Sequence, residues 1–303
     1  MAAHGLVVMM TSVAWLCQSV ACFDCSPVPI TSDDILFYNR IPKAGGTSLV
    51  RLAHAIADSP KRPFSAVWQI MDDRNFFDED KERSNVGSVM AKKHHHADRP
   101  MFYEQHVRLL NFSRFGYRQP IHINIVREPT ERVQSSYYYQ RYANIPYTAQ
   151  LRSWLGEQFD WSINKCIEAE YGCKSWPWMI DNMNLMVGFF CGHHEDCRDR
   201  TSAIALERAQ ANVLHHYAVV GVTERYNESV WMLSQVLPTF FKTLPDFYEQ
   251  KPVHNANNAK PELLTDANRR KLLTLGQDER LYDFIQGVFM ERLAACRRRF
   301  PEA

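Results

Sequence analysis

The segment from residue 43 to residue 48, Lys-Ala-Gly-Gly-Thr-Ser, places a cation beside two adjacent glycines and two hydroxyl groups. Glycine has no Cβ, so the backbone N–H groups of such a loop can come close to the oxygens of a phosphate or sulfate. Lys43 would add a full positive charge to the partial charge of a helix N-terminus. An ordinary strand-to-helix turn with a surface lysine is the alternative. We predict an anion site made by Lys43, Ala44, Gly45, Gly46, Thr47 and Ser48.

This loop differs from the nucleoside-triphosphate P-loop, in which the lysine follows the second glycine. Here Lys43 precedes Gly45 and Gly46. A lysine that leads into Gly-Gly-Thr-Ser resembles instead the 5′-phosphosulfate loop of sulfotransferases that use 3′-phosphoadenosine 5′-phosphosulfate.

His106 is the candidate general base. Its neighbours Tyr103, Val107, Leu109 and Leu110 place it at the edge of the core. Histidine is the side chain best suited to accept a proton near neutral pH. A histidine that is only packed and hydrogen-bonded in place is the more common case, so this assignment depends on the rest of the chain.

Arg127 and Ser135 are candidate ligands of a phosphate. Arg127 ends an apolar run, and Ser135 follows two helical turns later. An arginine offers a forked donor to an anion, and a serine adds a hydroxyl group. Either residue alone could equally be a helix-capping arginine or a surface serine.

Strands and helices of an α/β sheet would position these residues. Residues 35–38 and 121–126 are apolar runs typical of buried strands, and each precedes a polar loop and a helical pattern. Ligands of open α/β sheets bind beyond the carboxyl ends of the strands, so both loops are expected at one edge. A third strand, 217–224, and the helix after it are predicted to be scaffold.

Other segments lead to weaker expectations. We expect His94–His96 to lie in a solvated cationic loop and the Trp-rich segment 176–190 to belong to the core. A polar loop at 251–260 could close over a nucleotide, and one helix is expected from about residue 265 to residue 300.

Length, charge and the N-terminus restrict the class of protein. The chain has 303 residues and a net charge of +1, which argues against a bulk nucleic-acid binder. Residues 6–22 carry no charged side chain, so segment 1–22 is predicted to be a signal anchor or a cleaved signal peptide. Residues 23–34 would form a short linker and 35–303 one catalytic domain in the secretory pathway.

The cysteines agree with an oxidising compartment. Cys166 lies near Cys173 and Cys191 near Cys197, which favours two local disulfides over a zinc site of different spacing. Cys25 and Cys296 have no obvious partner in the sequence. Asn111 and Asn227 open glycosylation motifs.

Five blocks occur in order along the chain: PKAGGTS, HVRLLNFSRFG, INIVREPTERVQSSYYYQRY, FFCG and VVGVTE. Together, from about residue 35 to residue 241, they resemble the uronyl 2-O-sulfotransferase family. This family includes the heparan sulfate and the dermatan/chondroitin 2-O-sulfotransferases. The block LLNFSRFG is more similar to the dermatan/chondroitin branch.

The resemblance implies a P-loop-like α/β fold, with a central, mostly parallel sheet flanked by helices. It also implies a luminal enzyme of the Golgi membrane, which would be secreted if the N-terminal segment were cleaved. Such an enzyme transfers a sulfuryl group from 3′-phosphoadenosine 5′-phosphosulfate to the 2-hydroxyl of iduronic or glucuronic acid in a glycosaminoglycan. No metal is expected.

The family's residue roles are carried over by motif. Lys43 and the backbone of residues 44–48 match the ligands of the 5′-phosphosulfate. Arg127 and Ser135 match those of the 3′-phosphate. The local cysteine pairs also match disulfides of the family.

Two further residues match the reaction centre of the family. His106 matches the catalytic histidine, and Arg40 matches an arginine near the reacting groups. One departure stands out, because heparan-acting members carry a second histidine where this chain has Glu104. A carboxylate beside a polyanionic substrate is electrostatically unfavourable unless it orients His106.

The partner implied by the resemblance is a glycosaminoglycan chain, so a basic groove is expected. The arginines proposed for it are Arg108, Arg114 and Arg141. No nucleic acid is expected, and a homo-oligomer is left open. The alternatives are another carbohydrate sulfotransferase, a kinase with a shifted loop, or a non-catalytic glycan-binding protein.

Overall fold

The computed structural model describes residues 24–67, 73–143, 145–250 and 262–301. The predicted targeting segment 1–22 and the polar segment 251–260 lie outside these ranges. Within these ranges the sheet has five strands, all parallel, in the order β2-β3-β1-β4-β5. The strands are β1 (Ile35–Tyr38), β2 (Ser65–Val67), β3 (Met101–Glu104), β4 (Ile121–Val126) and β5 (Tyr217–Val222). This arrangement confirms the predicted α/β fold class.

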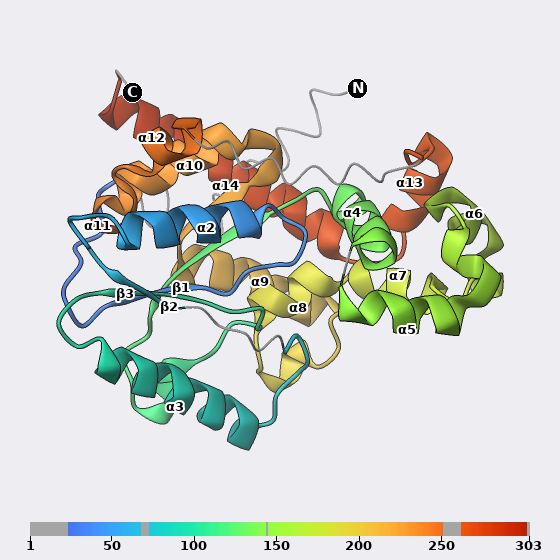
Figure 1. The fold of residues 1–303 in the computed structure, drawn as a ribbon, viewed down its shortest axis with the longest axis horizontal. Helices are drawn as coiled ribbons and strands as arrows, with labels where there is room; N and C mark the ends of the chain where they lie inside the picture. Colours follow the sequence, from blue (N-terminus) through green and yellow to red (C-terminus); the bar gives the residue numbers. More distant parts are fainter. Residues whose placement is uncertain (1–23, 68–72, 144, 251–261, 302–303) are drawn as a thin grey trace.

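Strand β1 shows why a strand in the middle of this sheet can be apolar along its whole length. Its side chains alternate between two faces, as in any strand. Leu36 and Tyr38 belong to the core that includes helix α2 (Gly46–Ala57). Ile35 and Phe37 belong to the core beneath helix α3 (Glu79–His95). Because helices cover both faces (Figure 1), a continuous buried run replaces the polar–apolar alternation of a one-sided sheet.

The remaining helices complete these two layers and a smaller lobe (Figure 1). They are α4 (Pro129–Tyr142), α5 (Pro146–Leu155), α6 (Ile163–Ala169), α7 (Trp176–Asn182), α8 (Leu185–Cys191), α9 (Ala203–His216), α10 (Tyr226–Val236), α11 (Pro238–Phe241), α12 (Leu244–Gln250), α13 (Asp266–Leu273) and α14 (Asp278–Arg299). Short 3₁₀ turns are η2 (Phe112–Phe115), η3 (Gly156–Asp160), η4 (Glu170–Gly172), η5 (Glu195–Cys197) and η6 (Thr223–Arg225).

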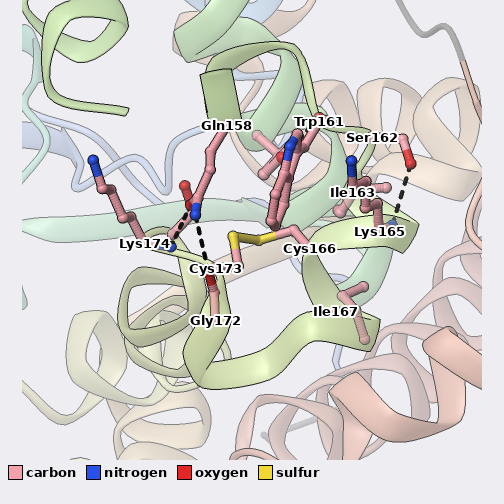
Figure 2. Close-up of a disulfide and its surroundings, with 12 residues drawn as sticks. Gln158, Trp161, Ser162, Ile163, Lys165, Cys166, Ile167, Gly172, Cys173 and Lys174 are labelled. Atoms are coloured by element: carbon pink, nitrogen blue, oxygen red, sulfur yellow. Dashed lines mark hydrogen bonds between the residues drawn. A yellow bond between two sulfur atoms is a disulfide. The ribbon is translucent and has the colours of Figure 1, made fainter. Parts of the chain in front are cut away.

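The smaller lobe packs around its own apolar cluster, to which α4, α6, α7 and α13 contribute. The predicted disulfide Cys166–Cys173 links two nearby positions within this lobe and is shown in Figure 2. Beside it, Gln158 donates to the carbonyl of Gly172 at 2.9 Å and accepts from the N–H of Lys174 at 2.8 Å. The second predicted disulfide, Cys191–Cys197, is also present.

The segment predicted as a linker is packed against the domain. Residues 24–34 form no helix or strand, but the N–H of Val28 donates to the carbonyl of Val236 at 2.8 Å. Cys25 forms a disulfide with Cys296 in α14, 271 residues later in the chain. The described part of this segment is therefore fixed to the C-terminal helix.

Two other expectations were wrong. His94 and His95 end helix α3, whose first turn is acidic and whose last turn is basic, as the helix dipole favours. The single C-terminal helix is broken between α13 and α14, where a Cβ on Gly276 would collide with the carbonyl oxygen of Met183. Only glycine allows this approach of two backbone segments.

No helix within the described ranges is long and apolar enough to cross a membrane.

Candidate functional site

A cavity of about 1200 Å³ lies at the carboxyl ends of the strands. The chain leaves β1 toward β2 and leaves β4 toward β5, so the two loops diverge between these neighbouring strands. Such a switch point is the usual ligand site of an open α/β sheet. The loop after β1 and the residues after β4 both line the cavity, together with His106 after β3.

The loop after β1 has the backbone of an anion cradle. Lys43 and Gly45 adopt positive φ angles of 68° and 79°. Gly46 opens helix α2, and a Cβ there would lie 2.8 Å from the hydroxyl of Tyr38. No side chain caps the N-terminus of α2 and its first turn has no acidic residue, so its N–H groups suit an anionic ligand. The ammonium of Lys43 lies 3.7 Å from the centre of the Tyr139 ring.

The N-terminus of helix α4, unlike that of α2, is capped by a side chain. The carboxylate of Glu128 accepts hydrogen bonds from the N–H groups of Thr130 and Glu131, so its N-terminus is already capped. Side chains therefore face the cavity from this element: Arg127 and Ser135 both line it, and Ser135 is buried. Arg127 is also paired with Glu131, with 3.3 Å between nitrogen and oxygen.

Thr223 joins the two loops. Its hydroxyl, directly after β5, lies 3.0 Å from the carbonyl oxygen of Ala44 and 2.8 Å from that of Val126. The ring of Tyr226 packs on the same loop, since a Cβ on Gly45 would lie 3.1 Å from it. Burial raises the pKa of Tyr226, so its hydroxyl stays protonated as a donor.

His106 is held by the backbone of the loop that follows β1. Its Nδ1 lies 2.8 Å from the carbonyl oxygen of Arg40. A carbonyl only accepts, so Nδ1 carries the hydrogen and the neutral ring keeps its lone pair on Nε2. The side chain of Arg40 is ion-paired with Glu104, with 2.8 Å between Nε and Oε2. Arg40 and His106 both line the cavity.

The charge of the cavity selects an anionic ligand. The described residues that line it include no aspartate or glutamate. The lysine and arginine side chains that line it are those of Arg40, Lys43, Arg51, Arg74 and Arg127. A polar molecule with several negative groups is therefore favoured over a neutral or cationic one.

The structure brings together the predicted residues of the loop from Lys43 to Ser48, except Ala44, with Arg40, His106, Arg127 and Ser135. Ala44 is buried and contributes its carbonyl to the contact with Thr223.

The three arginines predicted to bind substrate lie elsewhere. Arg108 is buried and donates to the carbonyls of Arg74 and Cys197 at 3.2 and 3.1 Å. Arg141 is buried and donates to the carbonyl of Phe159 at 3.1 Å. Both were proposed for a basic groove, whereas in the structure both donate to carbonyl groups inside the protein.

Arg114, the third of these arginines, is exposed and does not line the main cavity. It pairs with Glu79 and with Glu82 of helix α3 and lines a separate cavity of about 590 Å³. Its charge is partly compensated by these two carboxylates, and its role in binding the acceptor stays a prediction.

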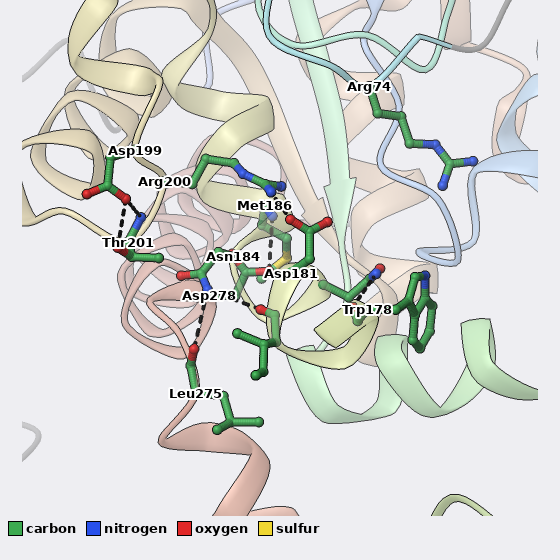
Figure 3. Close-up of polar contacts among 12 residues, drawn as sticks. Arg74, Trp178, Asp181, Asn184, Met186, Asp199, Arg200, Thr201, Leu275 and Asp278 are labelled. Carbon is green, nitrogen blue, oxygen red and sulfur yellow. Dashed lines mark hydrogen bonds and ion pairs between the residues drawn. The ribbon is translucent and has the colours of Figure 1, made fainter. Parts of the chain in front are cut away.

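Several residues of the cavity were missed. Thr223 and Tyr226 follow β5, a unit interpreted as scaffold, although the strand-end rule that found Arg127 applies equally there. Trp178 lies in the segment assigned to the core, and Arg74 was not considered. Figure 3 shows the side chains of Arg74 and Trp178 apart from the buried carboxylate of Asp278, which accepts from the N–H of Met186 at 3.0 Å.

Both asparagines of the glycosylation motifs are exposed, but their surroundings differ. Asn111 caps the turn η2 through its side chain. Asn227 lies in helix α10, where Ser229 of its motif is buried and its hydroxyl contacts the backbone of Val222.

A profile of the sulfotransferase family matches residues 28–289 of this chain. The chain is 30% identical to heparan sulfate 2-O-sulfotransferase hst-2 of Caenorhabditis elegans over 266 residues, which cover 86% of this chain and 79% of that protein. It is 30% identical to heparan sulfate 2-O-sulfotransferase 1 of Homo sapiens over 244 residues, 79% of this chain and 65% of the human protein. The protein of the same name from Gallus gallus gives the same identity and coverage. The chain thus spans just under two thirds of the length of these vertebrate relatives.

Proposed function

We propose that this chain, which belongs to the sulfotransferase family and within it to the uronyl 2-O-sulfotransferases, sulfates the 2-hydroxyl of hexuronic acid in a glycosaminoglycan. The donor is 3′-phosphoadenosine 5′-phosphosulfate. The observation that carries this proposal is the single cavity in which the loop of Lys43, the pair Arg127 and Ser135, and the imidazole of His106 meet.

The residues present fit this donor by charge and by size. The cavity has cationic groups on the β1 side and on the β4 side, as a nucleotide with anionic groups at both the 5′ and the 3′ position requires. Its volume of about 1200 Å³ exceeds the roughly 300–1,000 Å³ of pockets for one small molecule, which leaves room for part of an acceptor. When bound, the donor supplies an activated sulfuryl group on a phosphate leaving group.

The chain's own groups provide binding, charge stabilisation and a base. Lys43 and the N–H groups at the start of α2 hold the 5′ end, and Arg127 and Ser135 hold the 3′-phosphate. Sulfuryl transfer is an in-line displacement similar to phosphoryl transfer, so charge builds up on the leaving oxygen. Lys43 stabilises this charge, a contribution worth about 3–4 kcal/mol at comparable sites.

His106 acts as the general base. Because Nδ1 donates to the carbonyl of Arg40, the lone pair on Nε2 accepts the proton of the attacking sugar hydroxyl. Arg40 lines the same cavity and offers guanidinium N–H groups to the anionic acceptor or to the sulfuryl oxygens.

The acceptor is dermatan or chondroitin sulfate in this proposal, with heparan sulfate as the alternative. Glu104 in place of a second histidine and the block LLNFSRFG support the first assignment. The names of the relatives, which are heparan sulfate 2-O-sulfotransferases, support the second. We place the enzyme in the Golgi lumen, held by the N-terminal segment or released by its cleavage. The three disulfides found in the described part of the chain support an oxidising compartment.

The test is transfer from radiolabelled 3′-phosphoadenosine 5′-phosphosulfate to desulfated dermatan, chondroitin and heparan chains, followed by disaccharide analysis. We expect label on the 2-oxygen of hexuronic acid. His106→Asn should lower the rate about 100- to 10,000-fold, the usual contribution of a general base, and should leave nucleotide binding intact. His94→Asn, at an exposed histidine of α3, is the matched control and should keep the wild-type rate.

Other outcomes would contradict this proposal in distinct ways. Label on a hexosamine would identify a different carbohydrate sulfotransferase, and phosphate transfer from ATP would identify a kinase. Glycan binding without any transfer would identify a non-catalytic lectin. An undiminished rate in His106→Asn would remove this histidine from the chemistry.

A further inference from the structure

A connected group at the ends of the neighbouring strands β1 and β3 consists of Arg40, Glu104 and His106. Tyr38 of β1 is in register with Glu104 of β3, and the N–H of Gln105 donates to the carbonyl of Tyr38 at 3.1 Å. This pairing places Arg40, two residues past Tyr38, beside Glu104. His106, two residues past Glu104, contacts the backbone of Arg40.

Glu104 is buried, and a buried carboxylate is costly without a partner. Its side chain is 1% exposed, and Oε2 lies 2.8 Å from Nε of Arg40, which is 18% exposed. The ion pair uses the inner nitrogen of the guanidinium, so the two outer nitrogens remain as donors on a side chain that lines the cavity. Glu104 itself does not line the cavity, so its charge does not face an incoming polyanion.

The same arginine fixes the base from its backbone. The carbonyl of Arg40 accepts from Nδ1 of His106 at 2.8 Å, which selects the tautomer with the lone pair on Nε2. A change in the position of Arg40 would therefore affect both the guanidinium and the imidazole. The departure of this chain from the pattern of heparan-acting members falls on the residue that anchors Arg40.

We propose that Glu104 is a positioning residue, whose buried carboxylate anchors Arg40 so that its guanidinium faces the reacting groups and its carbonyl orients His106. This inference rests on the proposed sulfotransferase function. In this chain the residue at position 104 does not contact the acceptor directly and acts on the reaction through Arg40.

A double-mutant cycle with Glu104→Gln, Arg40→Ala and the double variant tests the inference. Glutamine keeps the shape and removes the charge. We expect Glu104→Gln to lower kcat at least 10-fold and to leave the Kd for 3′-phosphoadenosine 5′-phosphate within about 2-fold. Because Glu104 acts only through Arg40, the double variant should be no slower than Arg40→Ala alone. An unchanged kcat in Glu104→Gln, or losses that multiply, would overturn the inference.

Glu82→Gln is the matched control. Glu82 is also buried and paired with an arginine, Arg114, but it lies at the separate cavity beneath α3. The same substitution there should change thermal stability without changing kcat. If Glu82→Gln lowers kcat as much as Glu104→Gln, the effect is one of general destabilisation and the inference fails.

The ¹⁵N shifts of the histidine ring provide a readout that needs no turnover. We expect the tautomer protonated at Nδ1 for His106 in the wild type and in Glu82→Gln, and a mixture of tautomers in Glu104→Gln. If Glu104→Gln does not fold, Arg40→Gln/Glu104→Gln leaves no unpaired buried charge and should show the same mixture. A retained Nδ1 tautomer would overturn the inference. A wild type that transfers no sulfate would count against the proposed function, and the tautomer would still decide the role of Glu104.

Discussion

Burial decides the protonation of a histidine that the proposed mechanism does not use. The ring of His193 stacks on Phe77, with centroids 4.3 Å apart, and its Nδ1 accepts from the N–H of Phe77 at 2.9 Å. Burial is the main reason that the pKa of His193 is lowered to about 3, and the positive charge of Arg108 acts in the same direction. Protonation of Nδ1 would break the hydrogen bond, so the folded protein keeps this ring neutral.

The consequence is a pH-dependent stability. An unfolded histidine binds a proton below about pH 6.5, whereas the folded His193 binds one only near pH 3. The unfolded state therefore gains protons as the pH falls through this window, and the free energy of unfolding drops by about 1.4 kcal/mol per pH unit. His193→Gln should remove this slope, as measured by urea unfolding at about pH 7 and pH 5.

His94→Gln, at an exposed position, should keep the wild-type slope. The buried His122, whose pKa burial also lowers to about 3, contributes equally to all three proteins and cancels in the comparison. An identical pH dependence in His193→Gln and in the wild type would contradict the assignment.

Single residues were predictable where local sequence sets their role. Lys43 and Gly45 were found because a glycine loop between a strand and a helix has few uses. The burial of Arg108 and Arg141 was not predictable, because a charged side chain is expected at the surface. Nothing local indicates that their donors satisfy distant carbonyls such as those of Cys197 and Phe159.

Among the elements, the 3₁₀ turn η6 couples the two ligand loops. The hydroxyl of Thr223 contacts the carbonyls of Ala44 and Val126. Ala44 lies in the loop after β1 and Val126 is the last residue of β4, and residues that follow both strands line the cavity. Removing the hydroxyl leaves both carbonyls without this donor and lets the loops move apart.

Thr223→Val keeps the shape of the side chain and removes the hydroxyl. We expect the affinity for 3′-phosphoadenosine 5′-phosphate, measured by calorimetry, to fall about 5-fold, which corresponds to roughly 1 kcal/mol for one hydrogen bond. Thr274→Val, where the hydroxyl only donates to Lys271 within the end of α13, is the control. Equal affinities of Thr223→Val and the wild type would show that the loops are set independently.

Elements were predictable where burial repeats in a short apolar run. β1, β4 and β5 were found in this way, and their positions differ little from those expected. Helix α3 was missed because its sequence is polar almost throughout, and only Glu82, Val86, Val89 and Lys93 are buried. Its ends are set by the cap Asp78 and by charge, which are weaker signals than apolar periodicity.

The whole molecule brings distant segments to one cavity through strand order. With β1 beside β4, the loop of Lys43 faces Arg127, although more than 80 residues separate them. The strand order was beyond the reach of sequence patterns, as was the disulfide between Cys25 and Cys296, because no local spacing indicates a contact across 271 residues.

The central claim is that these two segments bind opposite ends of one nucleotide, and truncation of the ligand tests it most directly. Calorimetry would compare 3′-phosphoadenosine 5′-phosphate with adenosine 5′-phosphate, which lacks the 3′ group. Arg127→Ala should weaken the first about 10- to 100-fold, the value of a charged hydrogen bond, and leave the second unchanged. Lys43→Ala should weaken both. Equal losses for both ligands in Arg127→Ala, or none, would contradict the account.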